Sequence, residues 1–192
     1  MRYFLELRYL GAAYCGWQRQ PDQPSVQQTL ERGLTTLLRE KIEVTGAGRT
    51  DTGVNASYYV AHFDCSEPVA DPAQIVYKLN FLLPGDISVW SLTPVGDDAH
   101  ARFHAREREY RYYIEPHKNP FTRHLTWQYY VPLDLERMNR AAALLLDYAD
   151  FTSFAKLNSN NRTNICHVMR AGWEPLPDGR QIGRASCRER VY

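Results

Sequence analysis

One glycine-rich stretch carries the residue types that a catalytic site needs. Residues 48–54 read Gly-Arg-Thr-Asp-Thr-Gly-Val, and another glycine stands at position 46. Glycines at this density let a loop bend tightly and hold one side chain out toward a ligand. Arg49 is placed to hydrogen-bond the carboxylate of Asp51, keep it ionised and fix its rotamer, which suits a nucleophile or an electrostatic catalyst. Spacing alone favours the simpler alternative, a structural turn in which Asp51 bonds to its own backbone and Arg49 is a surface charge.

Two predicted strands flank this loop. Short β-prone runs lie on either side of it, at residues 42–45 and 57–63. An earlier strand is predicted at residues 3–9, where apolar and aromatic side chains occupy the odd positions and mostly charged ones the even positions. The loop is therefore expected at one end of a sheet. Trp17 and Gln18, in the segment after the first strand, are expected to pack near it.

Two helices are predicted between these strands. Ser25, with a glutamine three residues later, is a capping signal before apolar residues at helical spacing, and Gly33 on their face is expected to let this helix approach the sheet. Asp71 and Pro72 begin the second helix. Its expected buried residues are Ile75, Val76, Leu79, Leu82 and Leu83. With a strand at 87–95, the order is βαββαβ, a ferredoxin-like arrangement.

After residues 96–98 the pattern restarts. The expected elements are a long strand at 102–115, a strand at 127–131, a helix capped by Asp134, and short strands at 151–155 and 168–174. We therefore predict an α+β protein with an N-terminal domain over residues 1–97, which contains the catalytic loop at 46–56, and a partial second domain over residues 98–180.

The end of the chain differs from the rest. Residues 181–192 show no hydrophobic period and carry several arginines, although the Pro-Asp-Gly turn before them should lead into a strand. The segment resembles the translation of a sequencing adapter. We predict a non-native tail outside the fold, with the natural chain cut near Arg180.

Composition sets few limits on function. The chain has 23 Lys and Arg residues against 22 Asp and Glu, so its net charge of +1 neither demands nor excludes a nucleic-acid partner. Four widely spaced cysteines without a C-x-x-C pair argue against a disulfide framework or a thiolate metal site. The charged N-terminus and the absence of a long apolar run predict a protein that is neither exported nor membrane-embedded, and so a cytoplasmic one.

Several stretches together resemble tRNA pseudouridine synthases of the TruA type. Residues 48–56 match the loop G-R-T-D-A-G-V-H-A of that family except at Thr52 and Asn55. Three further stretches agree in order and spacing, and a fourth, Phe151-Thr152-Ser153-Phe154, also resembles the family, so that the resemblance covers roughly residues 1–175. The three are Tyr9-Leu10-Gly11 with Tyr14-Cys15-Gly16-Trp17-Gln18, Phe103-His104-Ala105-Arg106 and Glu109-Tyr110-Arg111-Tyr112.

The resemblance implies a function and a set of roles. Asp51 matches the catalytic aspartate, Arg49 the arginine that pairs with it and takes the place of the flipped base, and Tyr110 the tyrosine that stacks on the target uracil. The implied reaction is the isomerisation of uridine to pseudouridine at positions 38–40 of the tRNA anticodon stem-loop, without metal or cofactor. Attack of Asp51 on the sugar, attack on the base, and proton removal to give a glycal all remain open.

The resemblance also implies an architecture. Two ferredoxin-like halves would share an extended antiparallel sheet, with the active site between them, and the full-length protein would form a homodimer. The second half would be incomplete in this chain. The chain as it stands is therefore expected to be inactive.

A run of basic residues could bind the RNA backbone. Arg102, Arg106, Arg108 and Arg111 recur mostly at even spacing and would share one face of the strand leading to Tyr110. Such a run is more often a solvated face. His100 and His104, four residues apart, could pair as metal ligands on a helix, but no third ligand is spaced nearby, so no metal site is predicted.

Two other functions compete with the isomerase. A βαββαβ unit with basic and aromatic strand residues also describes a non-catalytic RNA-binding module, although no segment matches the aromatic pattern of such modules. A hydrolase using Asp51 as a general base would need a second acid or base, and the sequence cannot place Asp64, Asp71 or His62 beside it.

Overall fold

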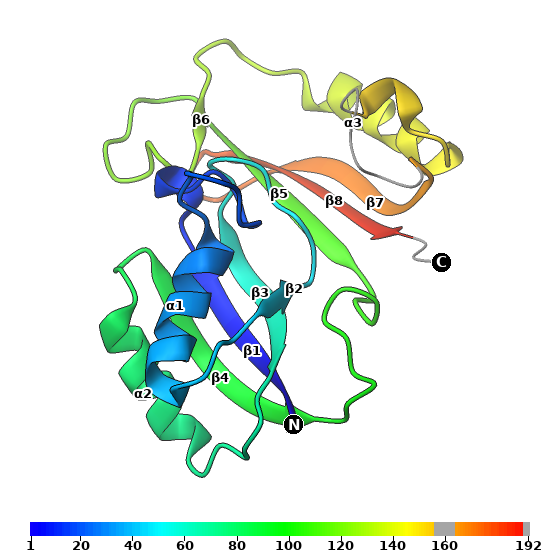
Figure 1. Ribbon diagram of the computed structural model, residues 1–192. Helices are drawn as coiled ribbons and strands as arrows, with labels where there is room; N and C mark the ends of the chain where they lie inside the picture. Colours follow the sequence, from blue (N-terminus) through cyan, green and yellow to red (C-terminus); the bar gives the residue numbers. More distant parts are fainter. Residues whose placement is uncertain (156–163, 190–192) are drawn as a thin grey trace. The chain divides into compact units, whose positions relative to one another are not determined.

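The structure, a computed structural model, describes residues 1–155 and 164–189 of the chain (Figure 1). It is an α+β protein with two four-stranded sheets, and it divides into two compact units, Met1–Ala105 and Arg106–Tyr192. Residues 98–105 thus belong to the first compact unit, and the domain bounds 1–97 and 98–180 stay a prediction. Each unit is described by itself below.

The first unit has the predicted order of elements. These are β1 (Arg2–Tyr9), α1 (Val26–Leu38), β2 (Val44–Gly46), β3 (Ala56–Asp64), α2 (Pro72–Leu82) and β4 (Ile87–Val95). The strands form an antiparallel sheet in the order β2-β3-β1-β4. The two helices lie on one face of the sheet (Figure 1). The expected βαββαβ order is confirmed for this unit.

Local signals in the sequence explain these elements. The Ser25 hydroxyl accepts a hydrogen bond from Gln28 N at 3.2 Å, and the Asp71 carboxylate accepts one from Gln74 N at 2.9 Å, so both helices begin at their predicted caps. In β1 every second residue points into the core, and Leu5 and Leu7 are almost fully buried. The alternation that predicted this strand is therefore the alternation of its two faces.

Two details of the helices differ from expectation. Gly33 does face a close neighbour, but that neighbour is α2, because a side chain at position 33 would lie 2.7 Å from Leu79 Cδ1. The glycine therefore brings α1 close to α2. Leu82 was expected in the core but is 51% exposed, since α2 ends there and the chain turns in at Leu83, which is buried.

Residues 96–105 belong to the first unit because its side chains hold them. The Arg2 guanidinium donates to the carbonyl oxygens of Asp97 and Ala99 at 2.7 and 2.9 Å. His62 Nδ1 accepts a hydrogen bond from Ala101 N at 3.2 Å. These contacts fold the segment into turns, and the strand that was expected from residue 102 begins only at Arg108.

The second unit contains four strands and one α-helix in its described part. They are β5 (Arg108–Glu115), β6 (Trp127–Gln128), α3 (Leu135–Leu144), β7 (Cys166–Pro175) and β8 (Gln181–Glu189). The sheet order is β6-β5-β8-β7, and β5 and β6 run parallel. Residues 152–154 form a 3-10 turn instead of the expected short strand. The described residues thus form two four-stranded groups, of which the second contains one parallel pair, and the extended antiparallel sheet shared by both halves stays a prediction.

The prediction that residues 181–192 lie outside the fold is wrong for the described part of this segment. Gly179, with φ of 84°, completes a turn in which its N–H donates to the carbonyl of Leu176 at 3.0 Å. The turn sends the chain back along β7, and β8 then fills the space between β7 and β5 in antiparallel register. Ile182 and Ser186 are buried there. The foreign origin of the segment stays a prediction.

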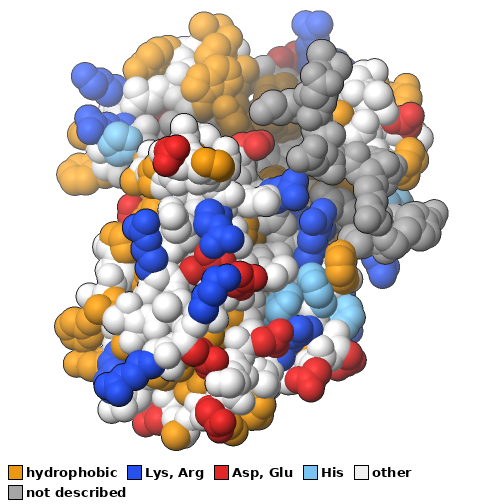
Figure 2. Space-filling model, in the orientation of Figure 1, with side chains coloured by type: hydrophobic (Ala, Val, Ile, Leu, Met, Phe, Trp, Pro, Cys, Tyr) orange, Lys and Arg blue, Asp and Glu red, His pale blue; other side chains and the backbone are white. Residues whose placement is uncertain are grey.

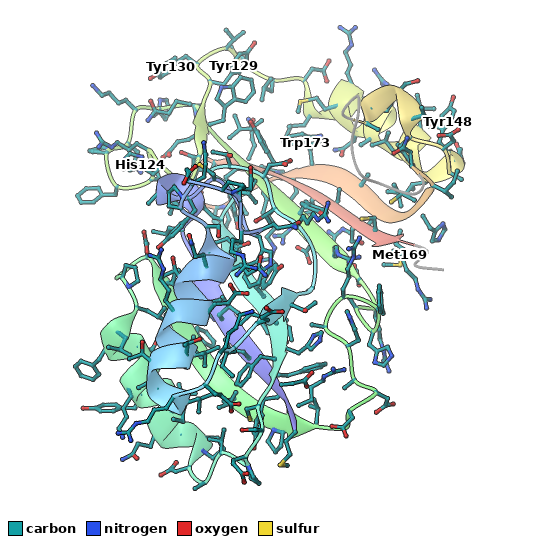
Figure 3. The ribbon with its side chains drawn as sticks, viewed as in Figure 1. His124, Tyr129, Tyr130, Tyr148, Met169 and Trp173 are labelled. Carbon is teal, nitrogen blue, oxygen red and sulfur yellow. The ribbon has the colours of Figure 1, made fainter. Side chains whose placement is uncertain are left out.

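Side chains of the second unit are more exposed than those of the first. Tyr130 and Tyr148 point away from the unit (Figure 3), and Phe121 and Phe154 are 93% and 80% exposed. Buried apolar residues are few in its described part, namely Ile114, Ala142 and Ile182. No helix in residues 1–155 and 164–189 is long and apolar enough to span a membrane.

Candidate active site

The glycine-rich loop connects β2 to β3, as predicted. The two strands pair in antiparallel register from Val44 and Phe63 to Gly46 and Ala61. The Ala47 N–H continues this pairing by donating to the carbonyl of Val60 at 2.9 Å. Residues 48–55 therefore leave the end of a rigid ladder as its connecting loop.

Three aromatic side chains lie beneath the loop. The rings of Trp17 and Tyr59 have centroids 4.3 Å apart, and Tyr9 packs on both at 6.1 and 5.7 Å. All three are buried. The hydroxyls of the two tyrosines point at the loop, because the Tyr9 and Thr50 hydroxyls are 2.9 Å apart and the Tyr59 hydroxyl donates to the carbonyl of Gly48. These three aromatic residues thus support the loop by packing and by hydrogen bonds.

The segment after β1 holds the loop from a second side. Trp17 N donates to the carbonyl of Thr50 at 3.1 Å, and Gly53 N donates to the carbonyl of Tyr14 at 3.4 Å. Trp17 therefore packs against the loop as expected, whereas Gln18 is exposed. The loop is fixed by backbone contacts on both sides of Asp51.

Asp51 opens a tight turn. Val54 N donates to the carbonyl of Asp51 at 3.2 Å, and Gly53 within this turn has a φ of 78°. Such a conformation strains any residue with a Cβ, which explains the glycine. The Asp51 side chain is exposed, as a residue that contacts a ligand must be.

The expected ion pair between Arg49 and Asp51 is not formed among the described residues. Both side chains are exposed, and neither forms an ion pair or hydrogen bond with the other within the part of the chain that the structure describes. An exposed pair gains little Coulomb energy and loses side-chain entropy on forming. The backbone of the loop, and not Arg49, therefore sets the position of Asp51.

Tyr110 belongs to the second unit. It lies in β5, opposite Ala185 of β8, and is 54% exposed. Tyr112, two residues on, shares its face and makes edge-to-face contacts with Trp127 and Trp173 at 6.3 and 6.4 Å. Tyr112 is 55% exposed. Tyr110 thus lies on an open aromatic face of this sheet.

The basic residues do not form one strand face. Arg102 lies in the turns before β5, Arg106 precedes the strand, and Arg108 opens it. Arg111 falls on the opposite face from Arg108, since their spacing is odd, and it pairs with Glu109 at 2.5 Å. The predicted stripe is therefore wrong as a strand face, although each arginine remains a candidate for RNA contact.

Histidines gather beside the C-terminal half of β3. The rings of His62 and His100 have centroids 4.5 Å apart, and histidine side chains lie together on this face in Figure 2. The Nδ1 atom of His104 lies 3.4 Å from His100 N, which donates to it. These nitrogens thus accept backbone hydrogen bonds. Among the described residues no group of three or more side chains could hold a metal ion.

The groups that a hydrolase would need are engaged elsewhere. Asp64 forms an ion pair with Arg2 at 2.8 Å, Asp71 caps α2, and His62 accepts from Ala101 N. His62 lies opposite Thr45 in the pairing of β2 with β3, and its Nδ1 is occupied by this hydrogen bond. The hydrolase alternative therefore has no second acid or base in this unit among these three candidates.

The sequence did not reveal the residues that support the loop. Tyr9, Tyr59 and Asn55 each bond to it or hold it, yet each reads as an ordinary strand or turn residue. Alternation in β1 and β3 places both tyrosines on the helix-covered face, but only the fold brings their hydroxyls to the loop.

An exposed carboxylate on a loop whose backbone is held from two sides suits a reaction that depends on a carboxylate. A sequence profile described as "tRNA pseudouridine synthase" matches residues 7–104, which include this loop. The chain belongs to the tRNA pseudouridine synthase family, whose members are RNA-modifying isomerases.

Individual relatives agree with the profile. The chain is 53% identical over 175 residues to tRNA pseudouridine synthase A of Bacteroides thetaiotaomicron. The matched region covers 91% of this chain and 65% of that protein. The corresponding protein of Porphyromonas gingivalis is 50% identical over 177 residues, covering 91% and 70%. The chain thus spans about two thirds of the length of these relatives. This membership removes the support for a non-catalytic RNA-binding module.

Proposed function

We propose that this protein is a tRNA pseudouridine synthase that isomerises uridine at positions 38–40 of the anticodon stem-loop. The observation that carries the proposal is the Asp51 turn, which presents an exposed carboxylate within the segment that matches the family profile. The names of the relatives support tRNA as the substrate.

The reaction balances without an outside reagent. The C1′–N1 bond of uridine breaks, the uracil turns, and a C1′–C5 bond forms, while C5 loses a proton and N1 gains one. Asp51 supplies the carboxylate that acts on the nucleoside. Attack on the sugar, attack on the base and proton removal all use this carboxylate and differ in the bond that it forms.

Two other residues have proposed roles. Tyr110 stacks on the detached uracil, and its exposed position in β5 supports this role. Arg49 fills the place that the extruded uridine leaves, and its exposed side chain, which does not pair with Asp51, is available for this contact. Arg102, Arg106, Arg108 and Arg111 are proposed to bind the RNA backbone.

Further features follow from the family. We propose two ferredoxin-like halves, a homodimer at full length, and the cytoplasm as the compartment where tRNA is met. The sheet order β2-β3-β1-β4 supports the first half of this description. Residues 1–192 on their own are expected to form no pseudouridine, since about a third of the length of the relatives has no counterpart in them.

A completed protein tests the proposal. Residues 1–175 would be joined to the part of the Bacteroides thetaiotaomicron relative that this chain does not match, and pseudouridine in tRNA would be detected by base-specific chemistry. Asp51→Asn should reduce its formation by at least about a thousandfold and leave tRNA binding nearly unchanged. Asp22→Asn is the matched control, because Asp22 is also exposed and its φ of 55° suits asparagine. Normal activity in Asp51→Asn would falsify the assignment.

A further inference from the structure

Asn55 joins the end of the catalytic loop to the segment after β1. Its side-chain Oδ1 accepts a hydrogen bond from Gly11 N at 2.7 Å, across 44 positions of the sequence. Asn55 was one of the two departures from the loop pattern of the family, where the pattern has histidine. We propose that Asn55 is a positioning residue, whose amide oxygen holds the Asp51 turn in place and whose role needs an acceptor but no proton transfer.

Within residues 1–155 and 164–189, the hydrogen-bond acceptor of the Gly11 N–H is Asn55 Oδ1. Gly11 begins the 3-10 turn Gly11–Ala13, and the residue before it, Leu10, provides no side-chain cap. The first N–H groups of a helical turn have no partner within the turn. Gly11 is buried, so losing Asn55 Oδ1 would leave a buried donor unsatisfied.

Gly11 also touches the Asp51 turn directly. A Cβ at position 11 would lie 2.1 Å from the carbonyl oxygen of Val54 and 2.8 Å from the carbonyl carbon of Gly53. The two backbones therefore meet without room for a side chain. The hydrogen bond to Asn55 keeps them in this close contact at the end of the turn.

The segment that carries Gly11 is itself anchored. Leu10 N donates to the carbonyl of Asp86 at 2.8 Å, and the Tyr14 hydroxyl donates to the Asp86 carboxylate at 2.7 Å. Burial, together with this hydrogen bond, raises the pKa of the Tyr14 phenol well above its ordinary value, so the hydroxyl keeps its proton. The segment that holds the loop is thus fixed by Asp86, which lies outside the loop.

Both ends of the Asp51 turn are then fixed to one support. Thr50 is held through Trp17 N and the Tyr9 hydroxyl, and Asn55 is held through Gly11. The Asp51 side chain, which is exposed, takes its position from this backbone. Small displacements of a reacting group cost large factors in rate, so the two ends serve as positioning contacts.

The required chemistry is that of a neutral acceptor. The amide oxygen of Asn55 accepts at every pH at which the protein is folded. An imidazole can accept through a neutral ring nitrogen but loses this capacity when it is protonated, near its ordinary pKa of about 6.5. Asn55→His should therefore hold Gly11 at high pH and release it at low pH, whereas Asn55→Leu should not hold it at all.

Amide hydrogen exchange on the whole 192-residue chain tests this. We expect Gly11 protection to fall about fivefold to tenfold in Asn55→Leu. In Asn55→His we expect it to be restored at pH 8 and lost at pH 5. Protection is compared at each pH with that of the unsubstituted protein, and the control Ser57→Ala, a change at an exposed position of β3, should match the unsubstituted protein at both values. Unchanged protection in Asn55→Leu, or pH-independent protection in Asn55→His, would overturn the proposal.

The effect of this contact on catalysis rests on the proposed function. It is tested separately, by the kinetics of the completed protein. In the completed protein, kcat should fall in Asn55→Leu and recover in Asn55→His at pH 8, with KM for tRNA little changed. A fall of kcat that Asn55→His does not rescue would contradict the positioning role. If the unsubstituted completed protein formed no pseudouridine in tRNA, the proposed function would be contradicted. The exchange results would still test whether Asn55 holds Gly11.

Discussion

The two units use four-stranded sheets of similar size but differ in what covers them. In the first unit, α1 and α2 bury one face of the sheet, and the core contains Tyr3, Leu5, Leu7 and Phe63 together with helix residues such as Leu30, Leu34 and Leu79. In the second unit, α3 packs on β7, and few apolar side chains are buried among the described residues. The first unit therefore has most of the hydrophobic stabilisation.

This difference separates two kinds of contribution to the proposed site. The Asp51 turn lies on the well-packed unit and is held by contacts within that unit. Tyr110 and the basic residues Arg106 and Arg108 lie on the unit with the small core. The proposed function thus assigns rigid positioning to the first unit and an exposed binding surface to the second.

The largest expected effect concerns the units as separate proteins. Residues 1–105 should unfold in urea as one cooperative transition, because the described core cluster lies within them. Residues 106–192 should bind a hydrophobic dye and lack a cooperative transition, because aromatic residues such as Phe121 and Phe154 are exposed. Circular dichroism during urea titration measures both. If residues 106–192 unfolded cooperatively and residues 1–105 did not, the second unit would be the more stable one, contrary to the comparison.

A matched pair of leucines gives the next effect. Leu5→Ala in β1 should lower the free energy of unfolding by about 2–5 kcal/mol, because Leu5 is fully buried. Leu144→Ala at the end of α3 should change it by no more than about 0.5 kcal/mol, because Leu144 is 59% exposed. Both are measured by urea unfolding of the 192-residue chain. If both variants lost the same free energy of unfolding, the second unit would have a core around Leu144 despite the exposure of this side chain.

Strong local signals predicted the fold of the first unit. Alternation in residues 3–9, the Ser25 cap and the Asp71-Pro72 start each depend on neighbours in the sequence, and each proved correct. The expected strand from residue 102 failed because Arg2 and His62, far away in sequence, hold that segment in turns. Such a contact has no local signal.

The same reasoning applies to the candidate site. The glycine at position 53 and the carboxylate at 51 were visible from their spacing, because the turn needs a left-handed residue. The missing Arg49–Asp51 pair and the support from Tyr9, Tyr59 and Asn55 were not visible, because they depend on where the loop meets the segment after β1. The expectation that residues 181–189 lie outside the fold failed for a related reason, since pairing with β5 and β7 does not need a hydrophobic period.

Acid should weaken the first unit selectively. Burial, with the nearby charges of His100 and Arg2, lowers the pKa of His62 from 6.5 to about 4, while Asp64 acts in the opposite direction. The folded state therefore favours neutral His62, and this stability is present above pH 6.5 and lost as the pH falls toward 4. The free energy of unfolding should fall by up to about 1.4 kcal/mol per pH unit in this window.

Urea unfolding between pH 7 and pH 4.5 measures this dependence. His62→Gln should remove this part of the slope, because glutamine has no proton to gain there. His117→Gln, at an exposed position of the second unit, is the control and should keep it. The same slope in His62→Gln and in the unsubstituted chain would rule out His62 as the source.

The smallest expected effect tests the second unit as a binding surface. Arg106 and Arg140 are both exposed, but Arg140 already pairs with Glu136 at 2.5 Å on α3. Arg106→Gln should weaken tRNA binding a few-fold and reduce the slope of log affinity against log salt by about 1, as expected for one phosphate contact. Arg140→Gln should change neither. Both should leave the free energy of unfolding within about 0.5 kcal/mol. Equal effects of the two variants on the salt slope would mean that RNA senses only the overall charge, and the second unit would then lose the specific binding role that distinguishes it from the first.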